Sequence, residues 1–264
     1  MLVVTLGDVL MDVIVRLNEP LAPGADANAA TRTSAGGQAA NVAAWVAALG
    51  ADARCVARRG DDLAGASVAE ELTARGVDVV GPSAGRTGLV VSLVGVDGER
   101  TMASDRGTAT LLEPDDLDPA WFACDCLHIS GYALLASPID AAAKRAVALA
   151  RAGGSRISVD LSASTRIRAH GVERFHGELE GLAPDLVFGN EDEWDAVGDV
   201  GTTRIVKRGP DGFDVDTARC QARDVAVVDT TGAGDALAAG FLVGGPELAA
   251  DAAARCVGQL GAMP

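Results

Sequence analysis

The regular alternation of two kinds of apolar segment most constrains the fold of this 264-residue chain. Short apolar runs typical of buried strands alternate with longer Ala- and Leu-rich runs typical of helices, and the connections between them are short. Repeated strand–helix units predict an α/β fold, in which helices cover both faces of a mainly parallel sheet. The expected strands are 2–6, 54–57, 127–130, 157–160, 186–188, 203–207 and 225–228, and the expected helices are 38–49, 63–75, 138–152, 172–182, 191–197 and one that starts near Ala236.

Two stretches depart from this alternation. Residues 12–33 contain two prolines and no helical pattern, and residues 89–102 alternate around Asp97-Gly98 in a way typical of a β-hairpin. Together they predict a small β flap attached to the α/β body.

Composition argues against several classes of partner. The formal net charge of -15 disfavours binding to nucleic acid or to an anionic membrane surface. Five scattered cysteines form neither a disulfide framework nor a zinc motif. The apolar N-terminus is interrupted by Asp8 and Asp12 and has no basic leader, and no apolar stretch approaches the ~20 residues of a membrane span. We therefore expect a cytoplasmic protein with no nucleic-acid or membrane partner.

Polar residues lie at or just beyond the carboxyl ends of the expected strands. They are Asp8, Ser130, Asp160, Asn190 and Asp229. In open α/β sheets, ligands bind at this edge.

The segment DTTGAGD, residues 229–235, carries the strongest local signal. A turn almost without side chains (230–234) joins the expected strand to a helix, so several backbone N–H groups are left unpaired at the positive end of the helix dipole. This geometry suits an anion. Asp235 would repel that anion, which makes sense if its carboxylate takes a proton from a second, neutral reactant. The alternative is that Asp235 only stabilises the start of the helix.

Three further motifs each allow a functional and a purely structural interpretation. In SAGGQAAN (34–41), Asn41 together with Asp12 could bind vicinal hydroxyls, or the segment could be a flexible loop before a helix. Asn190 and Glu193 could serve Mg²⁺ or only the helix dipole. KRGPDG (207–212) could lay glycine backbone against nucleotide phosphates or simply link two strands. The histidines His128, His170 and His176 have no metal-ligand spacing.

Together these stretches resemble the ribokinase-like, or PfkB-type, carbohydrate kinase family over nearly the whole chain. The matching motifs are GxxxxD at Gly7–Asp12, GGxxxN at Gly36–Asn41, GDDxxG at Gly60–Gly65, HISGY from His128, NxxE at Asn190 and Glu193, GxxG at Gly209–Gly212, and DTTGAGD. The resemblance implies one kinase domain over 1–264, built as three α/β/α layers around a central, mainly parallel sheet. Its β lid would come from about 12–33 and 86–106.

The resemblance also assigns roles to residues. Asp235 would be the catalytic base, while the N–H groups of Gly232, Ala233 and Gly234 would hold the transferring phosphoryl group. The acceptor would be bound by Asp12, Gly36, Gly37 and Asn41. ATP would be bound by Asn190, Lys207, Gly209, Gly212 and Thr231, with Asn190 and Glu193 organising Mg²⁺. Lys207 stands where the family often has threonine, and Ser162 where many members have asparagine. Some relatives bind a monovalent cation such as K⁺ near the Asp229 loop, and a lid strand often pairs across a homodimer.

The expected activity is ATP-dependent phosphorylation of a primary hydroxyl of a free sugar or nucleoside. A neutral acceptor is favoured because the four acceptor-site residues include no cation, and the lid arginines are expected to face solvent (Arg16, Arg86, Arg100 and Arg106). The alternatives are a kinase for a sugar phosphate or sugar acid, and a non-catalytic sugar- or nucleotide-binding protein. A dinucleotide-binding turn is disfavoured, because Leu237 stands where GxGxxG needs glycine.

Overall fold

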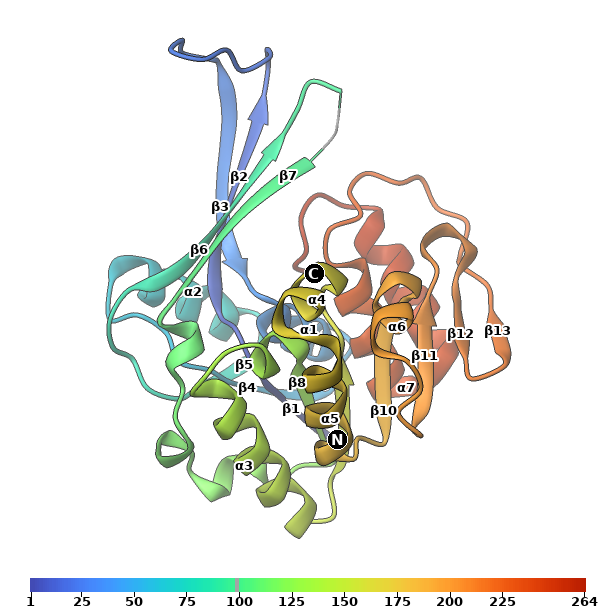
Figure 1. Ribbon diagram of the computed structural model, residues 1–264. Coiled ribbons are helices and arrows are strands. Elements are labelled where there is room, and N and C mark those ends of the chain that lie inside the picture. Colours follow the sequence, from blue (N-terminus) through green and yellow to red (C-terminus); the bar gives the residue numbers. More distant parts are fainter. Residues whose placement is uncertain (98–99) are drawn as a thin grey trace.

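The computed structural model describes residues 1–97 and 100–264, and within them the strands form two separate sheets (Figure 1). The larger sheet has nine strands in the order β13-β12-β11-β10-β9-β8-β1-β4-β5. Neighbours from β11 to β5 run parallel, and β12 and β13 add an antiparallel hairpin at one edge. The strands are β1 Leu2–Leu6, β4 Asp52–Val56, β5 Val77–Val80, β8 Cys126–Ser130, β9 Arg156–Asp160, β10 Leu186–Asn190, β11 Thr203–Lys207, β12 Phe213–Val215 and β13 Ala218–Cys220.

Helices cover both faces of this sheet. One core cluster joins it to α1 Gln38–Ala48, α2 Leu63–Ala74 and α7 Ala233–Val257. The other joins it to α3 Ile139–Ala152, α4 Ser164–His170, α5 Val172–Leu182 and α6 Glu191–Val197. Short 3₁₀ turns lie at Thr108–Leu111, Pro114–Asp116, Pro119–Phe122, Gly131–Leu134 and Gly209–Asp211. In β1, Val3 packs into the first cluster and Val4 into the second, as expected for a strand that is buried on both faces. The predicted three-layer α/β/α fold is confirmed.

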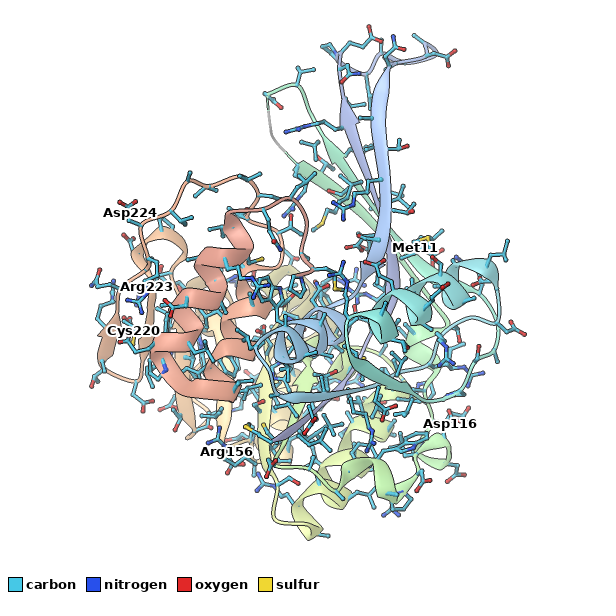
Figure 2. All side chains as sticks on the ribbon, turned by 180° about the vertical axis from the view of Figure 1, so that it is seen from behind. Met11, Asp116, Arg156, Cys220, Arg223 and Asp224 are labelled. Atoms are coloured by element: carbon cyan, nitrogen blue, oxygen red, sulfur yellow. The ribbon has the colours of Figure 1, made fainter. Side chains whose placement is uncertain are left out.

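The second sheet rises from the body as a lid (Figure 1). Its order is β3-β2-β6-β7, with β2 Leu10–Leu17, β3 Ala29–Gly36, β6 Thr87–Val94 and β7 Arg100–Gly107. Figure 2, seen from behind, places Met11 at the base of this lid. The β flap that the sequence predicts is therefore a sheet of four strands. The expected turn at Asp97-Gly98 lies partly outside the described residues.

The predicted strand 225–228 is wrong. The segment is an exposed loop, in which Val227 and Val228 are 65% and 58% exposed. The hairpin of β12 and β13 occupies the position next to β11 that the segment was expected to fill. It crosses the end of α7 instead, where the N–H of Val228 donates to the carbonyl of Val257 at 2.7 Å. Consequently Asp229 lies in a loop and not at the end of a strand.

Within the described ranges, no helix combines the length and apolar character needed to cross a bilayer.

Candidate active site

The carboxyl ends of β1, β8 and β9 bring a connected set of polar side chains to one edge of the sheet. The hydroxyl of Ser130 donates to Gln38 Oε1 at 2.5 Å and lies 3.4 Å from Asp8 Oδ1. Ser162, just beyond β9, donates to the same Gln38 oxygen at 2.5 Å. Three residues of the predicted polar rim, Asp8, Ser130 and Asp160, are thus linked through Gln38 and Ser162. Asn190 instead caps α6, and Asp229 lies in the loop before α7. Gln38 is a member that the sequence analysis did not single out.

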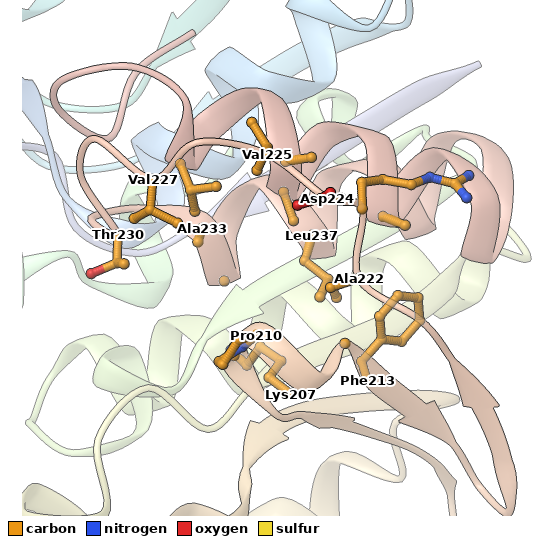
Figure 3. A pocket seen from close by; sticks show the side chains of 18 residues that line it. Lys207, Pro210, Phe213, Ala222, Asp224, Val225, Val227, Thr230, Ala233 and Leu237 are labelled. Atoms are coloured by element: carbon orange, nitrogen blue, oxygen red, sulfur yellow. The ribbon is translucent and has the colours of Figure 1, made fainter.

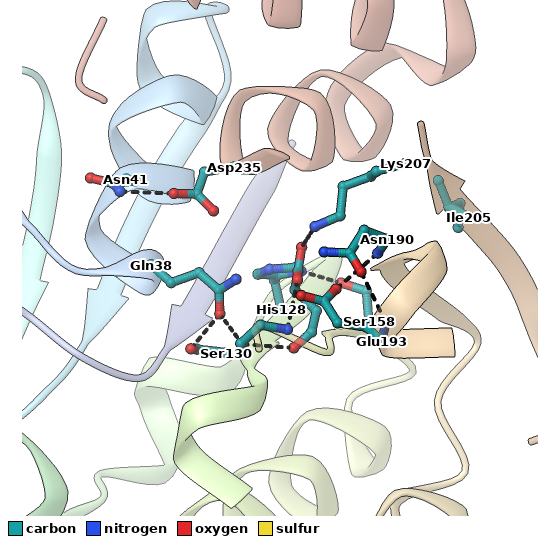
Figure 4. Close-up of polar contacts among 12 residues, drawn as sticks. Gln38, Asn41, His128, Ser130, Ser158, Asn190, Glu193, Ile205, Lys207 and Asp235 are labelled. Carbon is teal, nitrogen blue, oxygen red and sulfur yellow. Dashed lines mark hydrogen bonds and ion pairs between the residues drawn. The ribbon is translucent and has the colours of Figure 1, made fainter. Parts of the chain in front are cut away.

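The first turns of α1 and α7 meet beside this rim and bring Asn41 to Asp235. The Asn41 Nδ2 donates to Asp235 Oδ2 at 2.8 Å (Figure 4), whereas the buried Oδ1 of Asn41 has no described partner. Burial raises the pKa of Asp235 to about 7, and the charge of Asp160 adds to this, while Asn41 and Lys207 oppose it. A carboxylate with this pKa can take a proton near neutral pH.

A buried ion pair lies next to this carboxylate. Lys207, at the end of β11, places Nζ 2.7 Å from Oδ2 of Asp160, whose side chain is fully buried. Burial alone would lower the pKa of Lys207, but Asp160 and Glu193 outweigh it and raise this pKa, so the ammonium group stays charged. Sequence reasoning placed Asp160 at the rim without finding its partner, because the two residues are 47 positions apart.

The turn before α7 exposes backbone to the same space. Gly232 adopts φ 78° and precedes the helix. The N–H of Ala233 donates to Thr230 at 3.3 Å, whereas the N–H groups of Gly234 and Asp235 open the helix and have no intrahelical acceptor. A Cβ at Gly234 would lie only 3.2 Å from Lys207 Nζ. The turn therefore offers unpaired donors, a helix dipole and an ammonium group to one anion.

Asp12 and the glycines of the GGxxxN motif form a tight corner where β2 meets β3. Asp12 pairs with Ser34 in the lid register, and a Cβ at Gly36 would overlap the Asp12 carboxylate. Gly37 has φ 98°, which favours glycine. Burial raises the pKa of Asp12 to about 7, and Asp8 adds to the rise while Arg100 opposes it.

Two lid arginines that were expected to face solvent contact carboxylates of the body, although 29% of the Arg100 side chain stays exposed. Arg106 pairs with Asp8, and its guanidinium group stacks 3.6 Å from the ring centroid of Tyr132. Arg100 lies 3.5 Å from Asp229. Both contacts join residues about a hundred or more positions apart (98 and 129), and the sequence carries no local signal for them. The HISGY motif contributed Tyr132 as its last residue.

A pocket of about 710 Å³ lies between α7 and the end of β11 (Figure 3). Lys207, Gly209 and Gly212 line it as predicted, together with Ala233 and Gly234 of the turn. Its remaining wall is mostly apolar and includes Pro210, Phe213, Val225, Val227, Leu237, Ala250, Ala253, Ala254 and Val257. Val225 and Val227, which the sequence analysis assigned to a strand, therefore form part of the pocket wall. Thr231 and Asn190, predicted to bind nucleotide, do not contribute to this lining.

A second pocket, of about 500 Å³, lies under the lid. Asp12 and Thr231 line it, and Thr230 lines both pockets, so the two cavities meet at the DTTGAGD turn. The N–H and hydroxyl of Thr231 donate to Asp229 Oδ1 at 2.9 and 2.5 Å.

Asn190 and Glu193 bind each other's backbone in a capping box at the start of α6. The Asn190 side chain accepts from the N–H of Glu193 at 2.9 Å, and the Glu193 carboxylate accepts from the N–H of Asn190 at 2.8 Å. Burial raises the pKa of Glu193, as does the nearby Asp160, against the opposing effect of Lys207. In the part of the chain that is described, no three His, Cys, Asp or Glu side chains form a metal-binding group.

Comparison with known proteins identifies the architecture. The model of the pfkB family carbohydrate kinases matches residues 1–255. The chain belongs to this family. An ATP-dependent ribose-1-phosphate kinase of Halopiger xanaduensis is 34% identical over 260 residues, which cover 91% of this chain and 83% of that protein.

Among solved structures, the adenosine kinase of Sinorhizobium meliloti superposes with a TM-score of 0.87 at 26% identity, covering 99% of this chain and 95% of that one. An E. coli protein assigned as ribokinase II, solved in complex with ATP and Mg²⁺, has a TM-score of 0.83 at 23% identity and covers 99% and 94%. At 23% identity, the likeness to the E. coli protein shows the fold alone. The chain is thus a carbohydrate kinase of the pfkB family, as the motifs predicted.

Proposed function

We propose that this protein transfers the γ-phosphoryl group of ATP to a primary hydroxyl group of a sugar or sugar derivative. Asp235 acts as the general base. The observation that carries the proposal is the contact between Asn41 and Asp235 at 2.8 Å beside the open start of α7. Asn41 is suited to binding hydroxyl groups, and Asp235 is a carboxylate with a pKa of about 7. Their contact therefore places a hydroxyl-binding residue and a base next to a site for an anion.

In the proposed reaction, Asp235 accepts the proton of the acceptor hydroxyl as its oxygen attacks the phosphorus. The N–H groups of Gly232 and Gly234 and the ammonium group of Lys207 then stabilise the charge on the transferring phosphoryl group. The N–H of Ala233, also expected to take part, donates to Thr230 instead. The unpaired Oδ1 of Asn41 fits a hydroxyl donor of the acceptor.

The larger pocket fits ATP. Its apolar wall suits a purine base, and its inner end has Lys207 and Gly234, where the absence of a side chain lets phosphate approach the backbone. We expect Gly209 and Gly212 to lie along the nucleotide, whereas Thr230 takes the place that the sequence analysis gave to Thr231.

The residues present also fit Mg²⁺ near Glu193 and Asp160. Asp160 raises the pKa of Glu193 beyond the effect of burial, so a divalent cation would relieve the repulsion between these carboxylates. Mg²⁺ commonly uses one or two carboxylates together with phosphate and water, which agrees with the absence of a larger cluster in the described ranges. When bound, it would neutralise phosphate charge. A K⁺ ion near Asp229 and a homodimer stay predictions. The assignment of residues 1–264 to a single kinase domain also stays a prediction.

Two acceptor classes compete. The sequence favours a free sugar or nucleoside, and the similar adenosine kinase acts on a neutral nucleoside. The similar ribose-1-phosphate kinase acts on a sugar phosphate, and the inward position of Arg100 weakens the argument for a neutral acceptor.

The proposal is tested by incubating the protein with ATP, Mg²⁺ and a panel of sugars, nucleosides, sugar phosphates and sugar acids, and measuring ADP release. We expect acceptor-dependent ADP formation that is lost in Asp235→Asn. If no member of the panel supports ADP release, a non-catalytic binding protein becomes the better interpretation.

A further inference from the structure

The pocket under the lid has two arginines at its outer end. Arg16 of β2 and Arg100 of β7 both line it, with Ser92 of β6 one row deeper and Asp12 deeper still. The lid register pairs Arg16 with Val94, and Val94 with Arg100. The two arginines therefore stand in one row across the sheet, separated by the width of two strand spacings, roughly 10 Å.

Both guanidinium groups are available to a ligand. Arg16 makes no side-chain hydrogen bond or ion pair to another described residue. Arg100 contacts Asp229 only at 3.5 Å. The Asp229 carboxylate also accepts from the N–H and hydroxyl of Thr231 and from the N–H of Gly261 at 3.0 Å. Because these three donors satisfy Asp229, Arg100 can turn to a ligand without leaving that carboxylate unpaired.

From this arrangement we infer that Arg16 and Arg100 form a subsite for an anionic group of the acceptor, a phosphate or a carboxylate, at the end remote from the reacting hydroxyl. The inference rests on the proposed kinase function and revises the expected neutral acceptor. Guanidinium groups bind both anions through paired N–H donors. Ser92, which lines the same pocket one row deeper, adds a hydroxyl donor on the inner side of the two arginines.

The carboxylate of Asp12 does not prevent this. Arg16 lies four positions after Asp12 in β2, which places their backbones roughly 13 Å apart along an extended strand. Burial also raises the pKa of Asp12 to about 7, which weakens the negative charge that a ligand would meet there near neutral pH. The negative acceptor would thus meet cations at the outer end and hydroxyl-binding groups at the inner end.

The test uses matched acceptors that differ in the anionic group. Ribose is compared with ribose 1-phosphate, fructose with fructose 6-phosphate, and glucose with gluconate, so that the pairs distinguish phosphate from carboxylate. We expect at least one anionic member to have a kcat/KM about tenfold or more above its neutral mate. In Arg16→Gln and Arg100→Gln, this ratio should fall about tenfold, mainly through KM.

Arg86→Gln is the matched control. Arg86 carries the same charge beside the lid but pairs with Asp105 at 2.6 Å, is 58% exposed, and does not line the pocket. This variant should keep the wild-type ratio. Neutral acceptors that equal or exceed every anionic mate would overturn the subsite, as would pocket variants that keep the wild-type ratio, and the kinase proposal would survive either result.

If no acceptor gives ADP, the kinase proposal fails and calorimetry decides the subsite separately. Binding of ribose 1-phosphate about tenfold tighter than ribose, with the difference lost in Arg16→Gln, supports it. Equal binding of the two, or a difference that Arg16→Gln retains, overturns it.

Discussion

Replacing Lys207 with methionine should strongly destabilise the protein. The substitution removes the ammonium group that lies 2.7 Å from the fully buried carboxylate of Asp160. An uncompensated buried charge costs about 3–5 kcal/mol, a large share of the roughly 5–15 kcal/mol that holds most domains folded. Replacing both partners should recover most of this loss, because a neutral pair of similar volume is often as stable as a buried ion pair.

Urea unfolding at pH 7.5 without ligands measures this prediction. We expect Lys207→Met to lower the free energy of unfolding by about 3–5 kcal/mol at an unchanged m-value, and the double variant with Asp160→Asn to lower it by less. Lys144→Met is the matched control, because Lys144 pairs with Asp140 at 3.6 Å and is 47% exposed. Its removal should cost under about 1 kcal/mol.

Two results would refute the reasoning about this ion pair. One is a Lys207→Met protein within 1 kcal/mol of the wild type. The other is a double variant no more stable than Lys207→Met alone, since the coupling between the two residues would then be absent.

Three further predictions concern the turn, the metal and the lid. Gly234→Val should reduce nucleotide use and kcat together, because its Cβ would lie 3.2 Å from Lys207 Nζ and its branches would block phosphate; unchanged kinetics in a folded variant would contradict the anion site. Glu193→Gln should raise the Mg²⁺ concentration for half-maximal rate, and a titration that overlays the wild type would remove Glu193 from the metal site. The fold raises the pKa of Asp12 from 3.8 to about 7, so the wild type loses stability as pH rises across that interval. Asp12→Asn should therefore raise Tm relative to wild type most at pH 8 and least at pH 5; a difference that grows towards acid would have the wrong sign.

Local pattern was enough to predict the body of the fold, because each strand of the parallel sheet is a short apolar run bounded by turn residues. The same criterion failed at 225–228, since the valines of a pocket wall are as apolar as those of a buried strand. Short elements such as β5, β12 and β13 also escaped, because runs of three or four residues carry little periodicity.

In the candidate site, the residues of local motifs were predictable from the sequence, whereas the long-range pairs were not. Asp235, Asn41 and the glycines belong to contiguous motifs at the starts of helices, so their positions followed from turn–helix geometry even though the strand expected at 225–228 is a loop. The Lys207–Asp160 pair depends on how β11 and β9 are placed on either side of β10, and the Arg106–Asp8 pair depends on how the lid meets the body. Such contacts are set by the assembled tertiary structure, and no local pattern in a single sequence encodes them.

The central claim is that Asp235 takes the proton of the acceptor hydroxyl. Asp235→Asn keeps the size of the side chain and an oxygen that can accept from Asn41 Nδ2, so binding of ATP and acceptor should change little. Single-turnover measurement of phosphoryl transfer, with calorimetry of each ligand, separates chemistry from binding. We predict a rate about 10²–10⁴-fold lower with dissociation constants near those of the wild type. A variant that keeps more than about a tenth of the wild-type rate would contradict the claim and leave Asp235 as a helix-stabilising residue.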